Sequence, residues 1–124
     1  MRASIRGTEI YFDVEGMGLV PDGDTMRERP VAMVIHGGPG GDHSGFKPGY
    51  TPLAERMQLV YFDHRGQGRS SKKDPESWNL DENVEDMEAL RQSATASSRQ
   101  LRASSGRPSS SATQAACSVA SAAA

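Results

Sequence analysis

Apolar positions along the chain follow patterns that predict a few strands and helices. Through residues 9–15, Ile10, Phe12 and Val14 alternate with their neighbours, and this period of two is typical of a half-exposed strand. Residues 4–5 precede this strand across a short turn and predict its hairpin partner. The chain therefore begins with a predicted two-strand hairpin.

Two further runs are continuously apolar, at residues 31–35 and 59–62. Such runs are typical of strands that are buried on both faces of a parallel sheet. Each run ends in a glycine-rich turn, at residues 36–41 and 63–70 respectively. A strand, a connection and a second buried strand predict an α/β architecture in which these two strands pair in parallel.

The helices are predicted from caps and from a period near 3.6. Thr51-Pro52 has the form of an N-cap followed by proline at the first helical position, which predicts a short helix over residues 53–56. Residues 80–92 place Val84, Met87 and Leu90 on one face after a capping Asn79, and this predicts a longer amphipathic helix. Residues 16–30 and 71–79 are polar and rich in turn formers, so we expect surface loops there.

Composition divides the 124 residues into two parts. Residues 1–92 carry all sixteen acidic residues, all seven aromatic residues and eleven of the fourteen basic residues, which gives that part a net charge of −5. Residues 93–124 contain ten serines and ten alanines, with no acidic or aromatic residue. Such a segment buries too little apolar surface to offset its ordering entropy, so we expect a disordered tail after a domain of residues 1–92.

Charge and cysteine content exclude several classes of function. The net charge of −2 does not favour nucleic acid or an anionic membrane, and no apolar run approaches the roughly 20 residues that span a bilayer. With Cys117 as its one cysteine, the chain can form neither an internal disulfide nor a thiolate zinc site.

The N-terminus lacks the apolar core of a signal peptide, and we expect a soluble cytoplasmic protein. The histidines lack the usual metal-ligand spacing, and the glycine turns lack a complete nucleotide-binding motif, so we expect no metal or cofactor.

The first glycine turn has the strongest chemical signal. His36-Gly-Gly-Pro-Gly-Gly41 combines four glycines and a proline in six residues, and such a turn lets backbone N–H groups approach another molecule. Together with the run Leu59-Val-Tyr-Phe-Asp-His-Arg-Gly-Gln-Gly-Arg-Ser70, it resembles the start of an α/β-hydrolase of the proline iminopeptidase-like branch. The helix of residues 83–91 is similar to the helix that precedes the nucleophile strand in that family. The resemblance covers residues 1–92.

The resemblance implies roles for the residues of both turns. Gly38, Gly37, Pro39 and Gly40 would form the substrate loop, in which Gly38 is the first candidate and Gly37 the second for an oxyanion-hole N–H donor. The residues His36, Asp63, Arg65, Gly66 and Gly68 would support this loop without touching the substrate. The family reaction is acyl transfer from peptides with an N-terminal proline, or from related amides and esters, and it needs no cofactor.

The sequence after these motifs lacks the catalytic residues of that family. No Gly-x-Ser-x-Gly pentapeptide occurs in the sequence. Gly41–Gly45 resembles one, but its Ser44 lies one position too late. No histidine follows His64. We therefore expect a sheet truncated before its nucleophile strand, and no hydrolysis by this chain. We interpret residues 93–124 as a shifted reading frame, with a genuine low-complexity tail as the alternative.

The missing strand also suggests a function of another class. Without it, strand 31–35 would form an open sheet edge, which is a template for pairing with another chain. The alternative to a hydrolase segment is thus a non-enzymatic remnant or interaction segment that self-associates or binds another chain through this edge.

Overall fold

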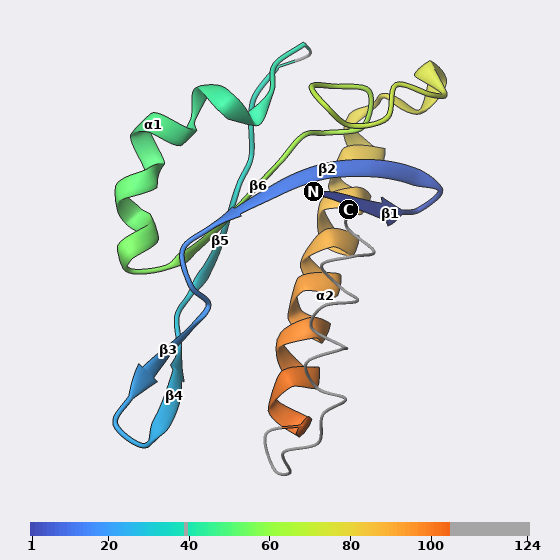
Figure 1. Ribbon diagram of the computed structural model, residues 1–124. Coiled ribbons are helices and arrows are strands. Elements are labelled where there is room, and N and C mark those ends of the chain that lie inside the picture. The colour runs from blue at the N-terminus through green and yellow to red at the C-terminus, as the bar shows by residue number, and fades with distance from the viewer. Residues whose placement is uncertain (39, 105–124) are drawn as a thin grey trace.

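The computed structural model describes residues 1–38 and 40–104, and these form a mixed sheet with helices on both faces (Figure 1). The sheet has four strands in the order β1-β2-β6-β5, and a separate pair of strands, β3 and β4, extends away from it. The strands are β1 (Arg2–Ile5), β2 (Thr8–Glu15), β3 (Leu19–Asp22), β4 (Thr25–Glu28), β5 (Val31–Val34) and β6 (Gln58–Phe62). The hairpin of β1 and β2, followed by the parallel strands β5 and β6, agrees with the expected α/β architecture.

The two predicted apolar strands pair as expected. β5 and β6 are parallel, with Val31 opposite Gln58 and Val34 opposite Tyr61. β6 also pairs antiparallel with β2, so it lies inside the sheet, and all its residues from Leu59 to Phe62 are buried. A continuous apolar run is what such a position requires, because both faces of the strand are covered.

The expectation of a surface loop at residues 16–30 is wrong. β3 and β4 form an antiparallel hairpin there, with a tight turn in which Gly23 has φ 61° and the Thr25 hydroxyl donates to the Asp22 carbonyl. All four residues of β4 are exposed. In β3 only Val20 is buried, so the hairpin lacks the run of apolar positions from which the other strands were predicted.

The first helix is also placed differently from the prediction. α1 spans Lys47–Tyr50 with proline near its start, between the 3₁₀ turns His43–Gly45 and Thr51–Glu55. Thr51 is thus the C-cap of α1, and its hydroxyl oxygen lies 2.8 Å from the Lys47 carbonyl oxygen and 2.9 Å from Glu15 Oε2. The earlier proline, Pro48, starts the helix one turn before the Thr-Pro pair that predicted it.

The second helix, α2, spans Leu80–Ser104 and begins where the sequence predicts. The Glu82 amide donates to the Asn79 side chain, as expected of a cap. Val84 is 48% exposed, so Met87 and Leu90 carry the packing without it. Disorder from residue 93 is wrong for residues 93–104, because alanine, arginine and glutamine propagate an existing helix well. The rest of the predicted tail, residues 105–124, lies outside the described residues.

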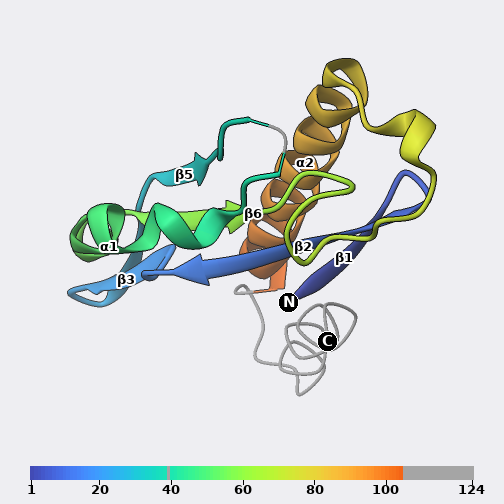
Figure 2. The same ribbon diagram turned by 90° about the horizontal axis from the view of Figure 1, so that it is seen from above.

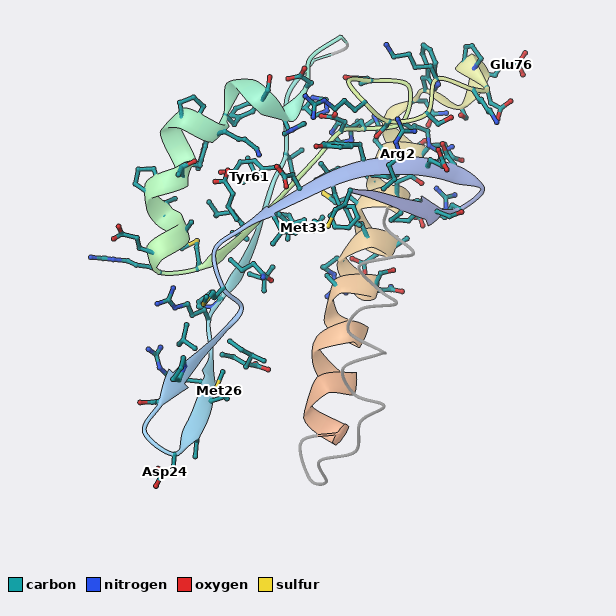
Figure 3. The ribbon with its side chains drawn as sticks, in the orientation of Figure 1. Arg2, Asp24, Met26, Met33, Tyr61 and Glu76 are labelled. Atoms are coloured by element: carbon teal, nitrogen blue, oxygen red, sulfur yellow. The ribbon has the colours of Figure 1, made fainter. Side chains whose placement is uncertain are left out.

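The helices cover opposite faces of the sheet, and the strands alternate between two apolar clusters. One cluster joins α2 to the sheet through Ile10, Phe62 and Leu90, and Met33 packs against it. The other contains Leu59 and Tyr61, with Phe46 and Met57 packed against it from the α1 side. Figure 3 shows Tyr61 on the α1 side of the sheet and Met33 on the α2 side. None of the helices in the described part of the chain has the length and apolarity that crossing a bilayer requires.

Candidate functional site

The first glycine turn leaves the sheet at the carboxyl end of β5, beside the turn that follows β6 (Figure 2). Gly38 and Gly40 have φ values of 70° and 88°, which L side chains rarely adopt. Gly37, Gly38 and Gly40 are exposed, and a Cβ built on any of the three would meet no atom within 4 Å. Backbone conformation requires glycine at Gly38 and Gly40, while the space around the turn stays open. Pro39 lies outside the described residues.

His36 lies beneath this turn. Its side chain is buried, and its Nε2 accepts a hydrogen bond of 3.1 Å from the His64 amide. The two imidazole rings meet edge to face with centroids 4.6 Å apart. A Cβ on Gly41 would lie 2.8 Å from the Gly37 carbonyl oxygen and 3.5 Å from His36 Nδ1, so the end of the turn closes over the ring. His36 thus links the beginning of the first turn to the second.

Asp63 links the end of the first turn to the second turn. It is fully buried, and its Oδ1 lies 2.8 Å from both the amide and the Nδ1 of His43, just after the first turn. Its Oδ2 accepts from the Arg69 amide at 2.9 Å. One carboxylate therefore holds the segment after the first turn and closes the second turn upon itself. Hydrogen bonds of this kind to a charged acceptor are about twice as strong as neutral ones.

The glycines of the second turn are packed tightly. Gly66 and Gly68 have φ values of 76° and 49°. A Cβ on Gly66 would lie 2.3 Å from the indole ring of Trp78, and one on Gly68 would lie 2.3 Å from Asp63 Oδ2. At both positions a side chain is excluded by space as well as by backbone conformation.

Arg65 connects the second turn to α2. Its Nε and Nη2 donate to the two carboxylate oxygens of Asp86, both at 2.6 Å, and Glu82 lies 3.2 Å from its Nη1. Arg65 and Asp86 are both buried. Their hydrogen bonds raise the pKa of Arg65 above its ordinary value. Two hydrogen bonds between buried, oppositely charged groups therefore fix the turn against the helix.

Two of these partners were missed from the sequence. Nothing in the sequence pairs His43 with Asp63, twenty residues later. Asp86 carried a usable signal, because it lies four residues before the buried Leu90 and so shares its helix face. An acidic residue on the packing face of a helix predicts a buried basic partner.

The described residues supply backbone donors but no assembled proton-transfer machinery. His43 lies against Asp63, and His36 accepts from a backbone amide, so these two rings are engaged in holding the turns. Burial lowers the pKa of His64, which favours its neutral form. Within residues 1–38 and 40–104, no group of three histidine, cysteine, aspartate or glutamate side chains could hold a metal ion.

Proteins of known family share sequence with this chain. The proline iminopeptidase of Thermoplasma volcanium is 34% identical over 88 residues, which are 70% of this chain and 27% of that protein. The proline iminopeptidase of Lactobacillus helveticus is 31% identical over 90 residues, or 69% of this chain and 28% of the relative. The chain thus spans about a quarter of the length of these curated relatives. No family model matches it.

Solved structures share the fold. A proline iminopeptidase-related protein from Thermus thermophilus superposes with a TM-score of 0.62 at 32% identity, over 75% of this chain and 31% of that one. An enol-lactonase from Burkholderia xenovorans gives a TM-score of 0.60 at 20% identity, over 77% of this chain and 33% of that one. At that identity the second likeness concerns the fold alone.

Proposed function

This chain carries part of an α/β-hydrolase fold of the proline iminopeptidase-like kind, and from that premise we propose that its first glycine turn contributes to an oxyanion hole. The reaction would be acyl transfer, in which a carbonyl oxygen becomes negatively charged in the transition state. The substrates would be peptides with an N-terminal proline, or related amides and esters. Gly38 is the proposed donor residue, with Gly37 as the second candidate.

The observation that carries this proposal is the open space at a conformationally constrained turn. Gly38 is held at a positive φ, yet a Cβ there would touch nothing within 4 Å. The positive φ accounts for the glycine, and the open space leaves room for a substrate to approach the backbone N–H. The links through His36 and Asp63 hold the two ends of the turn, and a preorganised donor needs such support.

A chimera with a relative tests the role of the turn. Residues 1–92 of this chain would replace the matching segment of the Thermoplasma volcanium proline iminopeptidase, and hydrolysis of a prolyl-coumarylamide would be measured. We expect the chimera to be active, and Gly38→Ala within it to lower kcat by roughly 10²-fold with little change in KM, since a displaced donor acts on the transition state. Gly23→Ala, which also replaces an unobstructed glycine at positive φ but lies in the β3–β4 turn, is the control and should leave kcat unchanged. An unchanged kcat for Gly38→Ala would contradict the proposed role.

By itself the chain of 124 residues is proposed to be inactive, because its sequence lacks the serine motif and the late histidine of the family. A fluorophosphonate probe, which reacts with activated serines, would be applied to the purified chain and to the chimera. We expect labelling of the chimera alone. Labelling of the purified chain would show that it holds a nucleophile of its own.

A second candidate function is favoured by one specific feature, the edge of the sheet. Among the described residues β5 pairs only with β6, and Val31 and Ile35 beside this edge are each 50% exposed. An apolar cavity of about 250 Å³ opens there between β5 and the side chains of Tyr50, Leu53 and Met57. An exposed apolar edge is a template for strand pairing, so we propose self-association through β5 as the alternative role.

Sedimentation velocity over a hundredfold concentration range tests this alternative. We expect the purified chain to form dimers or larger species, and Val31→Lys to shift the distribution towards monomer, because a charge at the edge opposes strand pairing. Arg27→Lys, on the exposed strand β4, is the control and should not change the distribution. A monomer at every concentration would exclude the alternative.

A further inference from the structure

The two links that hold the first glycine turn differ in how they use a histidine. At the beginning of the turn His36 accepts a hydrogen bond, through Nε2, from the His64 amide. At the end of the turn the His43 ring lies with Nδ1 2.8 Å from the Asp63 carboxylate, which can only accept. One histidine is therefore an acceptor and the other a donor.

Protonation affects these two roles in opposite ways. A neutral imidazole has one acceptor nitrogen, so the bond from His64 places the proton of His36 on Nδ1. That Nδ1 is buried with no hydrogen-bond partner among the described residues. Adding a proton at Nε2 would set two N–H donors against each other and bury a second unsatisfied group. A proton added to His43 leaves its Nδ1–H donating to Asp63 as before.

The carboxylates near the first link are already engaged in hydrogen bonds. His36 faces the His64 ring and the carboxylate of Asp42, which hydrogen-bonds to Ser44. His64 is near Asp63 and Asp86, but Asp63 is held by His43 and Arg69, and Asp86 by Arg65. The Nδ1 of His64 is also buried without a partner in the described part of the chain.

Burial lowers the pKa of His64, and the neighbouring His36 ring lowers it further. The unfolded chain then binds this proton more readily than the folded chain does. The resulting stability is complete above the unfolded pKa of about 6.5 and is lost as the pH falls below it.

We propose that protonation of His36 releases the beginning of the first glycine turn while Asp63 still holds its end, so that the turn loosens reversibly as the pH falls. The hydrogen bond from the His64 amide is the element that breaks. The effect on an oxyanion hole rests on the proposed function, but the release itself does not.

Amide hydrogen exchange of the full chain, measured by NMR and expressed as protection factors, tests this proposal. We expect protection of the His64 amide to fall at least ~10-fold from pH 7 to pH 5, the scale of one lost hydrogen bond. The amides of His43 and Arg69, which donate to Asp63, should keep their protection over the same range. A His64 amide whose protection does not change, or a parallel loss at His43 and Arg69, would overturn the proposal.

Variants at the three histidines of the chain assign the effect. His36→Gln keeps an acceptor near the same position that does not titrate, so protection of the residue 64 amide should become independent of pH. His43→Gln is the matched control and should retain the dependence. If His36→Gln does not fold, His64→Gln decides, since it keeps both the backbone donor and the His36 acceptor. Loss of the pH dependence in His64→Gln would assign the sensor to the other ring and refute the proposal.

Discussion

The two glycine turns of this chain lie side by side at the carboxyl end of the sheet and use glycine for different physical reasons. In the first turn Gly38 needs its positive φ but has open space around it. In the second turn Gly68 has both a positive φ and the Asp63 carboxylate where its Cβ would be. The first turn is therefore a surface that leaves room for another molecule, and the second turn is a packed support beneath it.

The largest effect is expected at the packed turn. Gly68→Ala forces a Cβ against a fully buried carboxylate at a left-handed backbone, and we expect it to lower the free energy of unfolding by at least ~4 kcal/mol. Urea denaturation followed by circular dichroism measures the loss. Gly7→Ala, at a positive φ with open space, is the control and should cost about 1 kcal/mol. Equal losses at both positions would mean that packing does not distinguish the second turn.

The next effect concerns the carboxylate that joins the turns. Asp63→Asn replaces one acceptor oxygen with an NH₂ group that faces a backbone N–H, and we expect a loss of about 3 kcal/mol. Asp42→Asn removes charge from an exposed carboxylate nearby and should change stability far less. The same urea titration compares them. A small effect of Asp63→Asn would show that the two turns are held independently.

A smaller effect is expected where the obstructing group can move. Gly66→Ala meets the indole of Trp78, a side chain whose residue is 41% exposed, and should cost about 2 kcal/mol. A double-mutant cycle isolates the clash, because in a Trp78→Ala background the cost should fall to about 1 kcal/mol for backbone strain alone. An unchanged cost in that background would mean that Trp78 is not the obstacle.

The smallest effect is expected at the open turn. Gly38→Ala should lower stability by about 1 kcal/mol, the cost of its left-handed backbone. Gly23→Ala has the same conformation and open surroundings in the β3–β4 turn, so the two thermal denaturation midpoints should shift equally. A much larger shift for Gly38→Ala would remove the distinction between the turns, and with it the observation that supports a substrate loop.

Local patterns predicted the parts of the fold in which local and tertiary preferences agree. The apolar run at 59–62 forms the buried strand β6, since no solvated position suits four consecutive apolar residues, and the run at 31–35 pairs with it in parallel. The cap at Asn79 fixed the start of α2. The β3–β4 hairpin and residues 93–104 were missed because neither segment shows the apolar periodicity from which the other elements were predicted.

What the sequence determined by itself is the pair of glycine-rich turns after two buried strands, because glycine content and strand ends are local properties. Which glycines face open space and which are packed was decided only by the tertiary structure. That difference depends on Asp63 and Trp78, whose positions relative to the glycines are set by the pairing of β6 with its neighbours and by the path of the chain into α2. The contact between His43 and Asp63 is likewise a product of folding, because a contact across twenty residues leaves no mark on local periodicity.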